Sequence, residues 1–161
     1  MFALDPDDRG ALLWRVAANN GGGRGGSVWG GAADSENVYY GMGSGGMSAL
    51  KMATGQRLWF QPINPANVRT GNNAAATIIP GVVFVGGTDG KLHALSTTDG
   101  NPLWEFDTNK NFDTVNKVAD AHGGAISSVG PVIVGGMMYI GSGYGVSGGA
   151  FGNVLLAFAP E

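Results

Sequence analysis

The chain has 161 residues, a length usual for one domain, and a formal net charge of −3. Only 13% of its residues are charged and 43% are hydrophobic, which argues against a disordered chain and against a nucleic-acid-binding surface. The absence of cysteine excludes disulfides and thiolate metal sites from this segment. No apolar run approaches the roughly 18 residues that a membrane helix needs, so we expect no membrane span.

Three tryptophans are spaced 45 residues apart: Trp14, Trp59 and Trp104. Each ends a similar phrase: FALDPDDRGALLW (2–14), MSALKMATGQRLW (47–59) and LHALSTTDGNPLW (92–104). A fixed period of this size indicates one supersecondary unit that is repeated along the chain. A fourth phrase, NVLLAFAPE (153–161), begins near the end and stops before a tryptophan.

The clearest unit is 72–107, which we interpret as four short strands. They are expected at AAATII (74–79), VVFVGG (82–87), KLHALS (91–96) and PLWEFD (102–107). The intervening Gly, Pro, Asp and Asn residues are turn signals. Four antiparallel strands in this length match the size of one propeller blade.

The predicted fold is therefore all-β, a partial propeller of about 3–3.5 four-stranded antiparallel blades. We assign its parts as the end of one blade (1–16), two complete blades (27–61 and 72–107) and an incomplete terminal blade (124–158). Propellers close with about four to eight blades, so we expect the chain to be a carboxyl-terminal fragment whose partners are the missing N-terminal blades of the same ring. The last unit is longer than the others, through the linker 108–123 and an insertion at 144–152.

The repeated residues have structural explanations. Glycine at the turn permits positive φ, and alanine in the third strand allows a neighbouring sheet to approach closely. We expect each repeated tryptophan to bury its ring against the next blade rather than to contact a ligand.

The repeat phrase has alanine, glycine and tryptophan at fixed spacing: Ala49, Gly55, Trp59; Ala94, Gly100, Trp104; and, one residue longer, Ala3, Gly10, Trp14. This phrase resembles the repeat of the quinoprotein β-propellers, the family of pyrroloquinoline quinone (PQQ) binding proteins and their relatives. The tail at 130–158 is similar to the carboxyl end of polyvinyl-alcohol-dehydrogenase-like members.

The resemblance implies an eight-bladed ring that is periplasmic or secreted in its full-length form, although no signal peptide is visible in this segment. In the enzymes of the family, PQQ lies in the central funnel beside a calcium ion and oxidises an alcohol, with an aspartate as general base. Two functions follow. The chain is a fragment of a PQQ-dependent alcohol dehydrogenase, inactive alone because about half of the central site is absent, or a non-catalytic scaffold for protein–protein interaction in the cell envelope.

The loops that lead from an outer strand to the next inner strand hold most of the candidate site residues. Arg24 and Arg69 occupy equivalent positions and could pair with the carboxylates of PQQ, or could be repeated structural residues. Asn72 is a candidate calcium ligand and Asn73 a candidate cofactor contact, although both also suit an ordinary turn.

The loop 108–124 is the most individual segment, and long ordered loops are often functional. Asp120 and His122 near its inner end could act as catalytic base and orienting group for alcohol oxidation, or could bond the backbone and only fix the loop. We expect His93, inside a third strand, to be a packed structural residue. We interpret Asp5, Asp7 and Asp8 as part of a turn rather than as a calcium loop.

Overall fold

A computed structural model describes residues 1–17, 26–27, 29–63, 71–145 and 148–160. All of the regular structure in these ranges is β-strand, which confirms the predicted all-β fold. The described ranges contain no helix long and apolar enough to cross a membrane.

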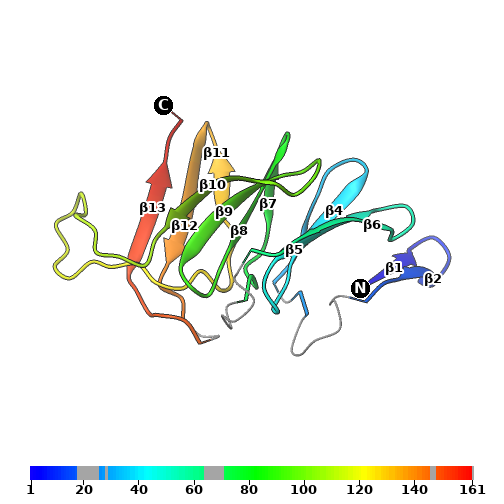
Figure 1. Ribbon diagram of the computed structural model, residues 1–161, viewed down its shortest axis with the longest axis horizontal. Coiled ribbons are helices and arrows are strands. Elements are labelled where there is room, and N and C mark those ends of the chain that lie inside the picture. The colour runs from blue at the N-terminus through cyan, green and yellow to red at the C-terminus, as the bar shows by residue number, and fades with distance from the viewer. Residues whose placement is uncertain (18–25, 28, 64–70, 146–147, 161) are drawn as a thin grey trace.

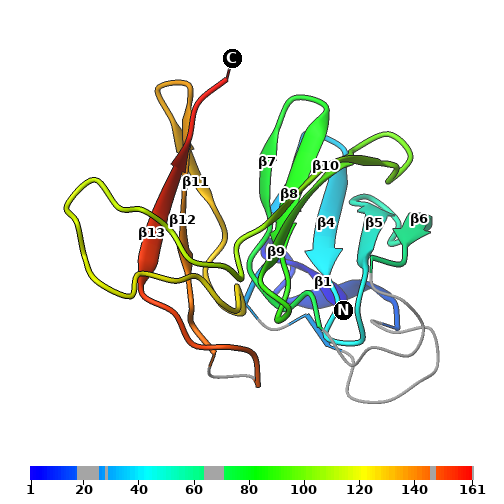
Figure 2. The ribbon, with the colours of Figure 1, turned by 60° about the vertical axis from the view of Figure 1, so that its left-hand side comes forward.

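The strands form four separate sheets, and in each sheet consecutive strands pair antiparallel. The first sheet has β1 (Phe2–Asp5) and β2 (Ala11–Arg15). The second has β3 (Ala32–Ala33), β4 (Asn37–Gly41), β5 (Met47–Lys51) and β6 (Arg57–Gln61). The third has β7 (Thr77–Ile79), β8 (Val82–Gly86), β9 (Lys91–Ser96) and β10 (Pro102–Asp107), and the fourth has β11 (Val132–Val134), β12 (Met137–Ser142) and β13 (Val154–Phe158). Figures 1 and 2 show these sheets side by side as an arc of blades, with the two ends of the chain at opposite ends of the arc.

The first strand of the third sheet is shorter than predicted. It was expected over 74–79 but spans only Thr77–Ile79. The backbone before it bonds instead to the segments that precede the first strands of the neighbouring sheets, here called inner segments: the Ala75 N–H donates to the Ser128 carbonyl at 2.9 Å, and the Ala76 N–H to the Gly30 carbonyl at 3.3 Å. These bonds bring three successive inner segments together. They also give hydrogen-bond partners to two main-chain N–H groups, which in an edge strand would face solvent.

The core lies between neighbouring sheets rather than inside any one of them. Between the second and third sheets, the buried cluster contains Tyr39, Met47, Ala49, Val83, Val85 and Leu95. A second cluster, between the third and fourth sheets, contains Ala74, Leu92, Ile126 and Ile140. Each fully buried aliphatic side chain contributes roughly 1.5–3 kcal/mol, so each blade depends on its neighbour for stability.

Trp14 and Trp59 dock on the following blade, as predicted, whereas Trp104 is 38% exposed and meets the following blade through an edge-to-face contact with Phe158. The indole N–H of Trp14 donates to the Met52 carbonyl at 2.8 Å, and that of Trp59 donates to the Thr97 carbonyl at 3.0 Å. The ring of Trp59 covers Gly100, where φ is +76° and an added β-carbon would lie 2.7 Å from the ring. The joint between blades is therefore a tryptophan against a glycine turn, and it recurs after one repeat.

His93 on β9 is buried between two strands, in agreement with its expected structural role. It is 5% exposed, and its Nδ1 lies 3.3 Å from Glu105 Oε2 on β10. Its Nε2 is buried and has no hydrogen-bond partner within the described ranges. Burial lowers the pKa of His93 below its ordinary 6.5; the charges of Glu105 and Asp89 oppose this shift and that of Lys91 adds to it.

We expect the protein to become less stable as the pH falls through and below 6.5. The folded chain binds a proton at His93 less readily than the unfolded chain, so each tenfold difference in proton affinity removes about 1.4 kcal/mol at acidic pH. Urea unfolding at about pH 7.5 and about pH 5.5 measures the effect. His93→Gln should reduce the pH dependence, whereas the exposed His122→Gln should retain it; an unchanged pH dependence in His93→Gln would contradict the assignment.

Candidate functional site

Two of the three inner segments are joined to the preceding sheet by the same kind of main-chain bond. The Asn72 N–H donates to the Met42 carbonyl, and the Ile126 N–H donates to the Gly87 carbonyl, both at 2.9 Å. Both acceptors come directly after the second strand of the preceding sheet. The inner segments therefore form a continuous wall on one side of the arc.

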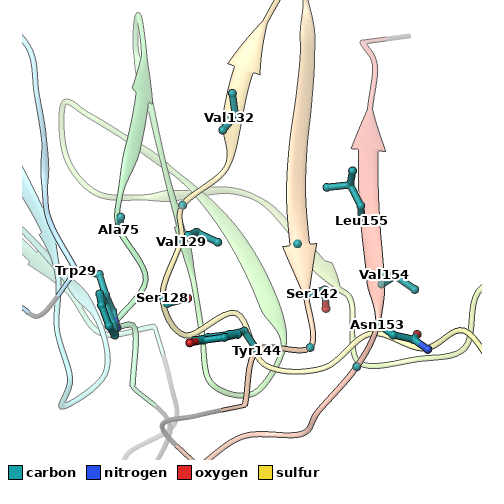
Figure 3. A pocket seen from close by; sticks show the side chains of 14 residues that line it. Trp29, Ala75, Ser128, Val129, Val132, Ser142, Tyr144, Asn153, Val154 and Leu155 are labelled. Carbon is teal, nitrogen blue, oxygen red and sulfur yellow. The ribbon is translucent and has the colours of Figure 1, made fainter.

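A pocket of about 970 Å³ lies along this wall and continues over the last sheet (Figure 3). Three inner segments contribute Trp29, Ala75, Ser128 and Val129 to its lining. The rest of the lining comes from β11, β12, β13 and the connection between the last two, and includes Val132, Tyr144, Asn153 and Leu155. A concave, mostly apolar pocket with a few polar groups has the general character of a ligand site.

The pocket is lined by none of the predicted site residues that the structure describes, and Trp29 is one of the lining residues that the sequence interpretation missed. Its side chain is 50% exposed and no hydrogen bond to its indole N–H occurs among the described residues. Trp29 and Ala74 each lie three residues before the first strand of their sheet. A signal was present in the sequence, because this fourth tryptophan falls outside the 45-residue series at a position where the next unit has alanine.

The two predicted asparagines lie in different environments. Asn72 is fully buried; its Oδ1 accepts the Gly46 N–H at 2.8 Å and its Nδ2 donates to the Gly86 carbonyl at 3.4 Å, so it links two blades. The neighbouring Asn73 has a buried Oδ1 without a hydrogen-bond partner in the described part of the chain. An unpartnered buried acceptor is costly, so Asn73 is the better-placed of the two to meet a cofactor or cation.

Asp120 and His122 lie on the exposed side of the 108–124 loop. The loop folds as a narrow hairpin, with the Phe112 N–H donating to the Ala121 carbonyl and the Gly123 N–H to the Lys110 carbonyl, both at 2.9 Å.

The side chains of the predicted pair do not meet. His122 Nδ1 lies 2.9 Å from the Asp120 main-chain oxygen, and Asp120 has φ of +55°, in the left-handed region. Neither residue lines the pocket, but the His122 N–H donates to the side chain of the lining residue Asn153 at 3.0 Å. The arrangement fixes the loop next to the pocket, and the catalytic roles of Asp120 and His122 stay predictions.

Arg24 and Arg69 lie outside the described residues, so their predicted role with the carboxylates of PQQ also stays a prediction. No group of three or more His, Asp or Glu side chains that could hold a metal ion occurs where the chain is described.

Four-stranded sheets that dock through tryptophan–glycine joints around converging inner segments define a β-propeller built from quinoprotein-type repeats. The chain belongs to the repeat family described as outer membrane protein assembly factor BamB, whose model matches residues 2–149. This confirms the family resemblance derived from the repeat phrase.

Two curated relatives match the whole chain. It is 40% identical over 186 aligned positions to a polyvinylalcohol dehydrogenase of Pseudomonas sp., and 34% identical over 188 positions to a polyvinylalcohol dehydrogenase of Sphingopyxis sp. strain 113P3. The chain spans 29% of the length of each of these proteins.

Two solved structures share the fold. A quinohemoprotein alcohol dehydrogenase from Pseudomonas putida HK5 superposes with a TM-score of 0.63 over 83% of this chain and 24% of its own chain. BamB from Moraxella catarrhalis superposes with a TM-score of 0.59 over 92% of this chain and 37% of its own. Both are 20% identical to the chain, so the likeness establishes architecture alone.

Proposed function

We propose that the chain is the carboxyl-terminal part of a PQQ-dependent alcohol dehydrogenase that oxidises a polymeric secondary alcohol. The observation that carries the proposal is the match of the entire chain, at 40% and 34% identity, to two proteins named polyvinylalcohol dehydrogenase. In the reaction, a secondary alcohol loses two electrons and two protons and becomes a ketone. The full-length protein would be periplasmic or secreted.

Two described residues offer contacts that suit a planar, polar cofactor. The exposed ring of Trp29 in the pocket offers a flat apolar surface, and Asn73, which does not line this pocket, offers a buried Oδ1 that lacks a partner in the described ranges. Bound PQQ would supply the two-electron acceptor. Arg24 and Arg69 stay candidates for its carboxylates. Calcium stays the candidate metal and Asn72 its candidate ligand, although the Asn72 Oδ1 already accepts the Gly46 N–H.

Titration of the full-length protein with PQQ and calcium, followed by tryptophan fluorescence, tests this function. We expect saturable quenching that requires calcium, and PQQ-dependent reduction of a dye when a secondary alcohol is added. The 161-residue chain alone is expected to be inactive, since about half of a central site in an eight-bladed ring would lie outside it. A folded full-length protein that neither binds PQQ nor reduces dye would contradict the proposal.

Asp120→Asn tests the proposed general base. Asparagine tolerates the φ of +55° at this position, so the fold should be retained while the carboxylate is lost. If Asp120 removes the alcohol proton, kcat should fall by roughly 10²–10⁴. The matched control is Asp113→Asn in the same exposed loop, for which we expect wild-type kcat. Equal kcat in the two variants would remove Asp120 from the reaction.

The second candidate function is a non-catalytic scaffold for protein–protein interaction in the cell envelope. It is favoured by the description of the matching family. A full-length protein that folds but binds no PQQ, and that co-purifies with envelope proteins, is the result expected for it.

A further inference from the structure

The connection between β12 and β13 is much longer than its counterparts in the two preceding sheets. Residues 42–46 join β4 to β5 and residues 87–90 join β8 to β9, whereas residues 143–153 join β12 to β13. In the two preceding sheets four or five residues are enough to connect the equivalent strands, so the blade fold does not require a connection as long as 143–153. Four of its described residues line the pocket: Gly143, Tyr144, Gly152 and Asn153.

The described ends of this connection are held firmly. The Tyr144 N–H donates to the Ala125 carbonyl at 3.0 Å, and the Ala125 N–H donates to the Ala150 carbonyl at 2.8 Å. The Ser127 hydroxyl donates to the Tyr144 carbonyl, and the Gly152 N–H donates to the Gly143 carbonyl at 3.0 Å. Tyr144 also forms a parallel bridge with Ile126. The main chain at Tyr144 is thus fixed to the inner segment, which limits the entropy lost when its side chain binds a ligand.

The Tyr144 side chain stays open to the pocket in spite of this anchoring. It is 53% exposed, and Figure 3 shows its ring extending below Ser128 toward the side where Trp29 lies. No side-chain hydrogen bond of Tyr144, Ser128 or Trp29 is found among the described residues. This mostly apolar pocket therefore presents a phenol, a hydroxyl and an indole N–H that can bond to a ligand.

We propose that Tyr144 forms a subsite for an extended hydroxylated chain in which CH₂ and CHOH groups alternate. This inference rests on the proposed function. The aromatic ring suits the CH₂ groups, and the phenol and the Ser128 hydroxyl suit neighbouring chain hydroxyls, each of which is both donor and acceptor. The pocket continues from Trp29 over the last sheet, so a chain of several units would extend along it beside Tyr144.

The test compares a polymer with a short substrate in the full-length protein. Tyr144→Ala should raise KM for polyvinyl alcohol about tenfold, through lost ring contact and one lost hydrogen bond, and should leave kcat and KM for 2-propanol within about twofold of wild type. Tyr144→Phe, which keeps the ring, should raise the polymer KM about threefold. Phe151→Ala is the matched control, because Phe151 is 72% exposed in the same connection but does not line the pocket.

Equal losses with both substrates, or an unchanged polymer KM in Tyr144→Ala, would overturn the subsite. A second readout does not need the cofactor: migration of the folded protein in a native gel that contains polyvinyl alcohol. Retardation of wild type and Phe151→Ala but not of Tyr144→Ala supports the subsite, even if no alcohol is oxidised and the proposed function fails. A wild-type protein that oxidises alcohols but is not retarded more than Tyr144→Ala overturns the subsite and leaves the proposed function standing.

Discussion

Gly100→Ala should lower the free energy of unfolding by about 3 kcal/mol. Two costs add. The residue has φ of +76°, where alanine is strained by about 1 kcal/mol, and the new β-carbon would lie 2.7 Å from the Trp59 ring, where overpacking costs roughly 1–3 kcal/mol. For a protein of this size, thermal unfolding should shift by roughly 6–12 °C.

Gly81→Ala separates the two costs. Gly81 has φ of +83° in the turn before β8, but no atom lies within 4 Å of an added β-carbon. It should therefore show the backbone strain alone, about 1 kcal/mol. Adding Trp59→Leu to Gly100→Ala should relieve the clash, so the double variant should be more stable than the sum of the two single losses predicts. Equal losses in Gly100→Ala and Gly81→Ala would contradict a docked tryptophan.

Asn72→Asp should destabilise the protein by at least about 2 kcal/mol, and calcium should not reverse the loss. The substitution places a carboxylate at a fully buried position and removes the amide donor to the Gly86 carbonyl, although it keeps an acceptor for the Gly46 N–H. A buried charge and a lost buried hydrogen bond both oppose folding. Urea unfolding with calcium and with chelator measures the effect.

Asn73→Asp is the informative comparison, because the Asn73 Oδ1 lacks a hydrogen-bond partner among described residues. If a cation binds there, calcium should stabilise Asn73→Asp more than wild type, since a carboxylate is a stronger ligand than an amide. Recovery of Asn72→Asp by calcium, without recovery of Asn73→Asp, would reverse the roles that we assign to these neighbours.

The repeat could be predicted from the sequence because its determinants are local. Turn glycines such as Gly55 and Gly100 require positive φ, and strands such as β8 and β9 are short apolar runs between turns, so both were identified by pattern. The predicted start of β7 was wrong by three residues because the Ala75 and Ala76 N–H groups bond to the inner segments of the neighbouring sheets. A partner contributed by a distant segment leaves no periodic signal.

The pocket was less predictable because it, too, depends on contacts between segments that are distant in the sequence. Trp29 and Tyr144 are 115 positions apart, and their meeting at one pocket depends on how the inner segments converge. Asp120 and His122 were paired by their closeness in sequence, but the imidazole bonds the main chain of Asp120 instead. Closeness along a loop constrains the positions of two backbones and leaves the directions of their side chains open.

The recurring joint between blades has a consequence for how such a ring can change in size. Trp14 donates to Met52 and Trp59 donates to Thr97, so successive joints use the same atoms shifted by 45 residues. A unit that is duplicated or deleted in register creates a new joint with the same chemistry as the old ones. Nearest-neighbour contacts of this kind make blades interchangeable modules, and the number of blades is then limited by the curvature that closes the circle rather than by the compatibility of neighbours.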